Sequence, residues 1–207
     1  MTVEPDSTSV ESGKKKPSRR GGLRESLTLI VSGVVVALLL QAFVFRNFSI
    51  PSESMENTLR EGDHVVVNQL HGESERGDVV VFRGWPGGDT IKRVIAVGGD
   101  TVKCCDAQKR ITVNGVPIDE KEYLYPDDFP SGEKFEKVVP PGRLWVMGDH
   151  RSASGDSRSH ENMEGEGTIS EDDVIGRAFA IYWPPSRVAI LSTPDVFAGP
   201  ETFDTAR

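Results

Sequence analysis

The stretch TIKRVIAV, residues 90–97, consists almost entirely of β-branched and apolar residues around a Lys-Arg pair. Side chains in a strand alternate between its two faces. Lys92 would share one face with Thr90, Val94 and Ala96, and the opposite face is also largely apolar. The stretch therefore predicts a strand that is buried on both faces and that carries a lysine in its interior.

Five other short runs are rich in β-branched or aromatic residues, and turn residues bound most of them. They are DHVVVNQ (63–69), GDVVVFR (77–83), RITVNGVPI (110–118), RLWVMGD (143–149) and GRAFAIYWP (176–184). In the third run, Asn114-Gly115 lies between ITV and VPI, which is a strong signal for a β-hairpin. The sequence thus predicts a mainly β domain, either a barrel or packed sheets. The polar, Pro-rich residues 126–142 are expected to form an exposed loop.

A different pattern precedes this domain. The run LTLIVSGVVVALLLQAFVF, residues 27–45, contains no charged residue. As a helix it would be roughly 28 Å long, about the thickness of the hydrocarbon core of a bilayer. It is longer than the core of a secretory signal peptide, and bulky residues follow it where a cleavage site needs small ones. Both of its faces are apolar, which argues against an ordinary buried helix. We expect an uncleaved transmembrane anchor.

The charge distribution predicts an orientation. A basic cluster precedes the apolar run, and Lys and Arg favour the cytoplasmic side of a membrane. The predicted organisation is a disordered cytoplasmic tail (1–26), a single-pass anchor (27–45), an extracytoplasmic β domain (46–190) and a C-terminal tail (191–207). The expected location is the plasma membrane. The net charge of the whole chain is −8, which argues against a nucleic-acid partner.

Cys104 and Cys105 are the only cysteines, and they are adjacent. Two alternatives stay open from the sequence, namely two free thiols or a disulfide between neighbours. Two cysteines without a nearby histidine make a poor zinc site. The acidic residues 161–173 lack the ligand spacing of a calcium loop, and a solvated loop is expected there.

Three stretches of the β domain carry residue types that suit catalysis. They are PSESM (51–55), IKRV (91–94) and GDHRSASGDSR (148–158). Burial lowers the pKa of a lysine, and a neutral amine can accept the proton of a serine. Taken alone, Lys92 could instead reach the surface or pair with a carboxylate. Taken alone, Ser54 could simply cap a helix or a turn.

A Ser-His-Asp triad is the competing arrangement, and it would need a histidine beside Ser54. The candidates are His64, His71, His150 and His160. Their spacing selects none of them. His150, next to Asp149, is the best candidate, although an exposed turn residue would look the same.

Together the three stretches resemble type I signal peptidases, the bacterial leader peptidases that use a serine–lysine dyad. An N-terminal anchor is followed by Pro-Ser-x-Ser-Met, then by a Lys-Arg strand some 40 residues later, and last by the loop at 148–158. The stretches RGDVVVF (76–82) and GGDTV (98–102) are also similar to family sequence. The resemblance covers residues 25–185, and the motifs are specific in combination although each is weak alone.

The resemblance implies a role for each matching residue. Ser54 matches the nucleophile, Lys92 the general base and Ser154 the serine that orients this base. The hydroxyl of Ser52, with the backbone N–H of Ser54, matches the oxyanion hole. Residues that match the structural loop are Gly148, Asp149, Arg151, Asp156, Ser157 and Arg158. Residues that match the substrate-binding surface are Ile50, Pro51 and Ile91.

The implied activity is that of a membrane-anchored serine endopeptidase. It would remove signal peptides from exported preproteins by cleaving after small residues of the A-x-A type, close to the secretion translocon and the lipid bilayer. No metal, nucleotide or other cofactor is expected. Two departures from the family pattern stand out. Arg151-Ser152-Ala153-Ser154 replaces a frequent Arg-Asp-Asn-Ser, which leaves the partner of Arg151 open, and Glu53 stands where many members have Gly.

Three other interpretations remain. A self-cleaving repressor protease also uses serine and lysine, but such proteins are cytosolic and bind DNA. A dedicated peptidase that processes a few surface proteins would carry the same motifs. A membrane-anchored β domain with an inactive site would serve for binding alone. Cleavage of a precursor separates this last interpretation from the others.

Overall fold

The structure is a computed structural model that describes residues 19–85 and 88–197, without the side chains of residues 19–23, 40, 42 and 43. Most of the predicted N-terminal tail and residues 198–207 of the predicted C-terminal tail lie outside this description. The chain divides into two compact units between Leu40 and Gln41.

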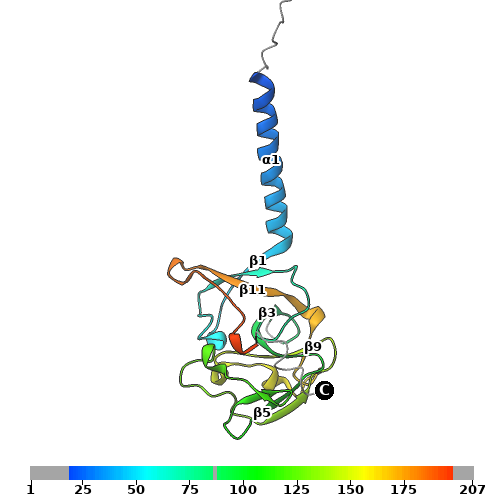
Figure 1. Cartoon of the computed structure of the whole chain (residues 1–207), viewed down its shortest axis with the longest axis vertical. Coiled ribbons are helices and arrows are strands. Elements are labelled where there is room, and N and C mark those ends of the chain that lie inside the picture. Colours follow the sequence, from blue (N-terminus) through cyan, green and yellow to red (C-terminus); the bar gives the residue numbers. More distant parts are fainter. Residues whose placement is uncertain (1–18, 86–87, 198–207) are drawn as a thin grey trace, which may run out of the picture. The chain divides into compact units, whose positions relative to one another are not determined.

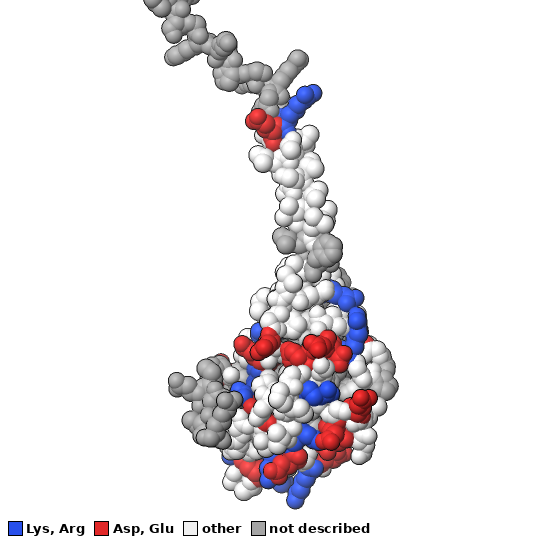
Figure 2. Space-filling model, turned by 90° about the vertical axis from the view of Figure 1, so that its right-hand side faces the viewer, with Lys and Arg blue, Asp and Glu red and all other residues white. Residues whose placement is uncertain are grey.

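The first unit is formed by helix α1, Arg19–Val44, which continues over the boundary by four residues. The helix includes the uncharged run and also the last residues of the predicted tail. Large apolar side chains are exposed at consecutive positions such as Val34, Val35 and Val36, so that they face every side of the helix. Figure 2 shows charged atoms near its first turns and none along the described part that follows. Among the described residues, no helix combines the length and hydropathy needed to cross a membrane.

The second unit is mainly β, as the sequence predicts (Figure 1). Its strands are β1 (Phe45–Ser49), β2 (His64–Asn68), β3 (Val79–Phe82), β4 (Thr90–Val97), β5 (Thr101–Cys104), β6 (Ile111–Val113), β7 (Val116–Pro117), β8 (Phe135–Val138), β9 (Arg143–Met147), β10 (Ile169–Ser170), β11 (Val174–Trp183) and β12 (Ala189–Ile190). Its short 3-10 helices are η1 (Glu53–Met55), η2 (Glu120–Glu122), η3 (Arg151–Ala153), η4 (Ser157–His160), η5 (Glu171–Asp173), η6 (Pro185–Arg187) and η7 (Asp195–Phe197).

Within the described residues these strands form two sheets. The larger has the order β1-β2-β11-β3-β4-β9-β10, with β12 added to β11, and all of its pairs are antiparallel. The smaller has the order β7-β6-β5-β8. Figure 1 places β1 and β11 at one end of this unit and β5 at the other. The packed-sheet alternative of the sequence prediction is therefore the better description.

Strand β4 lies in the middle of the large sheet, between β3 and β9. Its residues 92–96 are all buried, which confirms the predicted strand with two covered faces. The neighbouring β3 shows how the two faces are covered. Val79 and Val81 pack into one apolar cluster, whereas Val80 and Phe82 pack into another. Successive side chains of this uninterrupted apolar run thus point to opposite faces of the strand, and both faces are buried.

The predicted hairpin at Asn114-Gly115 is present, and it joins β6 to β7. Both turn residues have positive φ, 53° and 80°, as a two-residue type I′ turn requires. The prediction of a loop over residues 126–142 is partly wrong, because β8 lies within it. Only Phe135 of this strand is buried, so its pattern is too short to stand out from the polar residues around it.

Two further observations settle open points. Cys104 and Cys105 are joined by a disulfide bond, so the alternative of two free thiols does not hold in this structure.

Phe197 lies within the predicted C-terminal tail, yet it is buried and its ring packs against Tyr123. The ordered β unit therefore continues at least to this residue.

Candidate active site

Ser54 is the second residue of the 3-10 helix η1, and this helix directly follows the exposed residues Pro51 and Ser52. Its neighbour Met55 is fully buried and anchors the helix in the apolar cluster that also contains Leu59. The carbonyl of Ser54 accepts a hydrogen bond from the backbone N–H of His150 at 3.2 Å. The serine is thus held on one side by packing and on the other by the segment at residues 148–158.

Lys92 is supplied by β4, opposite Val80 of β3. Its side-chain Nζ donates a hydrogen bond of 2.8 Å to Ser54 Oγ, although 38 residues separate the two in the chain. Lys92 is 4% exposed and Ser54 is 7% exposed. The structure therefore brings a buried amine to a buried hydroxyl.

The surroundings of Lys92 favour its neutral form. Burial lowers its pKa from 10.5 to about 8, because the charged amine loses hydration. The negative charges of Asp156 and Asp149 act in the opposite direction and limit the decrease. A substantial fraction of the amine is therefore deprotonated at mildly alkaline pH, and in that form it can accept the proton of Ser54.

Ser52 lies beside the nucleophile candidate. Its Oγ is 3.4 Å from Ser54 Oγ.

The predicted substrate-binding residues differ in exposure. Ile50 is buried, Ile91 is partly buried, and both pack in the apolar cluster near Met55, whereas Pro51 is exposed. Ile91 and Pro51 thus keep surface for a substrate, while Ile50 lies mainly in the core.

Gly148 allows a close approach between two parts of the site. A Cβ at this position would collide with Ser154 Oγ and with the carbonyl oxygen of Ser54. Only glycine fits here because any Cβ would collide with these atoms; the backbone angles of Gly148 do not require it. The N–H of Gly148 donates to Asp156 Oδ2 at 3.0 Å, which fixes the turn.

Ser154 is predicted to orient the lysine, and the structure gives its hydroxyl another partner. Ser154 Oγ donates to Asp156 Oδ2 at 2.8 Å. Arg158 donates to both oxygens of the same carboxylate, each at 2.8 Å. Burial raises the pKa of Asp156, but the Arg158 contacts and the bonds from Gly148 and Ser154 outweigh it, so that the pKa falls below the usual value. Asp156 is therefore a buried anion that also acts on Lys92.

The remaining loop residues hold this arrangement to the sheet. Ser157 is fully buried, and its hydroxyl accepts a hydrogen bond from the N–H of Val146 in β9. Asp149 accepts two hydrogen bonds from Arg93, the residue after Lys92, with Arg93 Nε at 2.9 Å and Nη2 at 2.6 Å. Thr58 completes the group, since its hydroxyl accepts from Arg93 and donates to Asp149.

The partner of Arg151 is Glu120, which sequence reasoning did not identify. The two side chains are 0% and 2% exposed and form a direct ion pair. The hydroxyl of Tyr123 donates to Glu120 at 2.7 Å, and Arg93 lies over the Tyr123 ring at 4.5 Å. The sequence offered one signal for such a partner, namely that the loop motif contains Arg151 without a nearby acidic residue of the family pattern. This signal does not indicate where in the chain the partner lies.

The histidine alternative receives no support from the geometry. Among the described residues, Ser54 Oγ is hydrogen-bonded to Lys92 and lies near Ser52, and no hydrogen bond joins it to a histidine. His150, the best candidate, contacts Ser54 through its backbone N–H. A Ser-His-Asp arrangement is therefore absent from the described site.

A buried amine that donates to a serine hydroxyl in a mainly β domain fits the class of serine endopeptidases, and this chain is one of them. The family model described as signal peptidase, peptidase S26, matches residues 23–183. The chain therefore belongs to the signal peptidase family.

Three relatives that are more than 30% identical in sequence agree with this assignment. The chain is 38% identical over 242 residues to a signal peptidase I of Mycobacterium tuberculosis, covering 91% of this chain and 82% of the relative. It is 34% identical to a probable signal peptidase I of Mycobacterium leprae (90% and 86% covered), and 31% identical to signal peptidase IB of Staphylococcus aureus (84% and 96% covered). A crystal structure of a signal peptidase I from Enterococcus faecalis matches with a TM-score of 0.40 and 24% identity, covering 51% of this chain and 97% of that one.

Proposed function

We propose that this protein removes N-terminal signal peptides from exported preproteins, with Ser54 as nucleophile and Lys92 as general base. The observation that carries the proposal is the 2.8 Å hydrogen bond between Lys92 Nζ and Ser54 Oγ in a buried setting. The names of the relatives support the reaction, since each is a signal peptidase. The lowered pKa of Lys92 supports its role as base.

In this proposal, neutral Lys92 takes the proton of Ser54 while Ser54 Oγ attacks the scissile carbonyl. The Ser52 hydroxyl and the N–H of Ser54 stabilise the resulting oxyanion. The Lys92 ammonium then protonates the leaving amine, and an ester joins the signal peptide to Ser54. Lys92 next activates a water molecule, which hydrolyses the ester and frees Ser54.

The substrate would lie as an extended chain beside Ile91 and the segment before Ser54, and it would add a strand to the sheet. Small residues are preferred at the cleavage site in signal peptides. Cleavage after an A-x-A sequence is therefore the specificity we propose.

We also propose that the apolar run at residues 27–45 anchors the enzyme in the plasma membrane, with the N-terminus cytoplasmic and the β domain outside. The absence of charge over this run and the exposure of its apolar side chains on every side support this proposal. A signal peptide would place its apolar core in the same bilayer, so its cleavage site would emerge on the side of the membrane where we propose that Ser54 acts. Holding both partners at one surface raises their effective concentration.

The test uses the full chain in detergent and a secreted precursor with an A-x-A site, with the new N-terminus mapped by mass spectrometry. Wild type should cut after the second alanine, and Ser54→Ala and Lys92→Ala should both abolish the cut. Activity that survives Lys92→Ala would contradict the lysine base. A folded wild type that cuts no general precursor would instead favour a dedicated substrate or a binding role.

A further inference from the structure

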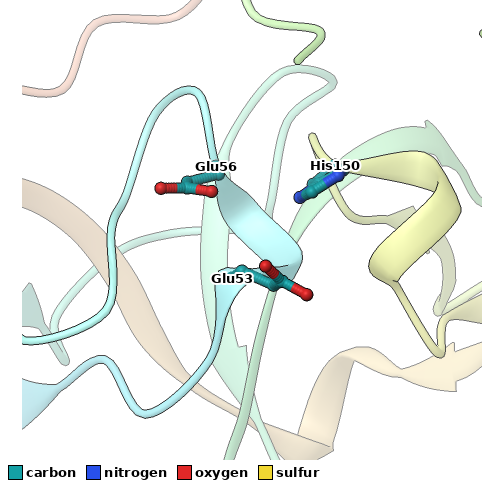
Figure 3. A group of neighbouring side chains, drawn as sticks. All are labelled: Glu53, Glu56 and His150. Carbon is teal, nitrogen blue, oxygen red and sulfur yellow. The ribbon is translucent and has the colours of Figure 1, made fainter. Parts of the chain in front are cut away.

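A group of three side chains beside Ser54 has no part in the proposed reaction. Glu53 is the first residue of η1, and Glu56 follows its last residue. A 3-10 helix has three residues per turn, so side chains at positions i and i+3 lie one above the other. Both carboxylates therefore leave the helix on the same side. Figure 3 shows them together, with the ring of His150 lying opposite on the neighbouring segment.

His150 is held in place by two contacts. Its backbone N–H donates to the Ser54 carbonyl, and its ring stacks on Tyr125 with 4.0 Å between ring centroids. The ring nitrogen Nδ1 is shielded from solvent and has no hydrogen-bond partner. Within the described residues neither ring nitrogen of His150 forms a hydrogen bond, so no protein group competes with an ion for the ring.

The charge of the two glutamates is also uncompensated locally. Within the described part of the chain, neither Glu53 nor Glu56 forms an ion pair or a side-chain hydrogen bond. Arg187 is near enough to attract Glu56, but its guanidinium is bound to Asp63. The group thus combines two negative charges with one unpartnered imidazole nitrogen.

We propose that Glu53, Glu56 and His150 bind a divalent transition-metal ion, with Zn²⁺ as the best match. One imidazole and two carboxylates form a ligand set that zinc uses, and a water molecule would take the fourth position. One ligand atom from each residue lies within 4.8 Å of the other two. Tetrahedral zinc brings such atoms to roughly 3.3 Å, which requires a small rotation of the exposed Glu53 side chain.

The binding site stands independently of the proposed peptidase reaction, because no group of it is needed for that reaction. It has a mechanical consequence. A bound ion would join the helix that carries Ser54 to the segment at residues 148–158. The folded protein should therefore become more resistant to thermal unfolding when Zn²⁺ is added.

The experiment is calorimetric titration of the full chain, in detergent and without a histidine tag, with ZnCl2. We expect saturable one-to-one binding with a dissociation constant below about 100 μM. Glu53→Gln, Glu56→Gln and His150→Asn should each weaken the affinity at least about tenfold. The matched controls Glu61→Gln and His64→Asn should leave it unchanged.

Two outcomes would overturn the site. One is wild type without saturable binding in this range. The other is binding that persists in the three variants or is lost in the controls, which would identify other ligands. Thermal unfolding without metal reports whether each variant folds. Should His150→Asn fail to fold, the double variant Glu53→Gln/Glu56→Gln decides, because both side chains leave the surface of η1 and neither is buried.

Discussion

Arg93 and Asp149 form a buried ion pair that connects the strand carrying Lys92 with the loop carrying Ser154. The two side chains are 2% and 1% exposed, and 56 residues separate them in the chain. Burial tends to lower the pKa of Arg93, but the carboxylate of Asp149 outweighs this effect and raises it. The position of the amine relative to the loop thus depends on an ion pair outside the site of reaction.

Removing one partner of this pair should be more damaging than removing both. Asp149→Ala leaves a buried guanidinium without its carboxylate and should cost about 3–5 kcal/mol of the free energy of unfolding. The double change Arg93→Met/Asp149→Leu should be markedly less destabilising, because no buried charge remains. Urea unfolding measures both. Equal losses in the single and double variants would contradict this account.

The pH dependence of cleavage should report Lys92. Because the neutral amine is the base, kcat/KM should rise with pH and level off above an apparent pKa near 8. Asp156→Asn removes a negative charge that raises the pKa of Lys92, so the rising limb should move to lower pH. Asp106→Asn, on the surface, serves as control. If the rising limb of the pH profile stays in place or moves to higher pH in Asp156→Asn, the assignment of Lys92 as the base is contradicted.

Replacing Lys92 should stabilise the fold while it abolishes cleavage. A pKa lowered from 10.5 to about 8 corresponds to a penalty of about 3 kcal/mol on the ammonium form. Between these pH values the unfolded chain binds a proton that the folded chain has lost, so wild-type stability rises with pH there. Lys92→Met should be more stable than wild type at pH 7, and the gap should narrow toward pH 10.

Urea unfolding at pH 7 and near pH 10 measures this difference. Lys121→Met is the matched control, because the side chain of Lys121 is 89% exposed. It should leave the pH dependence of wild type unchanged. A Lys92→Met variant that is less stable than wild type at pH 7 would show that the lost hydrogen bond to Ser54 outweighs the desolvation of the amine.

Gly148→Ala should damage the site by steric collision alone. The added methyl group would collide with Ser154 and with the backbone of Ser54, and a backbone atom cannot simply rotate away. We expect a loss of about 1–3 kcal/mol in stability and a large decrease in kcat. Gly155→Ala is the matched control, since a Cβ there meets nothing within 4 Å. Comparable effects in the two variants would point to chain stiffness instead of collision.

Ser52→Ala should lower kcat by about 100- to 1,000-fold if its hydroxyl helps to bind the oxyanion. KM should change little, because the interaction forms in the transition state. Ser152→Ala, with an exposed serine on the nearby loop, is the control. Steady-state kinetics on a peptide substrate measures both. An unchanged kcat in Ser52→Ala would assign the oxyanion to backbone groups alone.

The strands that the sequence predicts share one property, namely that apolar, buried residues recur along them. Strand β4 begins and ends where the pattern predicts, and its central residues 92–96 are all buried. The hairpin between β6 and β7 was predictable from Asn114-Gly115 alone. Strand β8 was missed because only Phe135 of its four residues is buried. A strand that contributes one core residue has no period to detect.

The candidate site divides in the same way. Ser54, Lys92 and the loop at 148–158 were found because each lies in a motif that is contiguous in sequence. Glu120, Tyr123 and Thr58 were not found, because each contributes a single side chain from a segment without a motif. Their importance comes from the buried charges that they contact, and these contacts exist only in the folded chain.

The ion pair between Arg151 and Glu120 has a consequence for shortening this protein. Residues 101–138 form the small sheet and η2, and none of the catalytic candidates lies there, so the segment invites deletion in a minimal enzyme. Such a truncation would keep the three stretches that contain the catalytic candidates, and it would still leave Arg151 without the carboxylate of Glu120. The smallest active version of this chain must therefore keep the second sheet, or replace Arg151 at the same time as it loses Glu120.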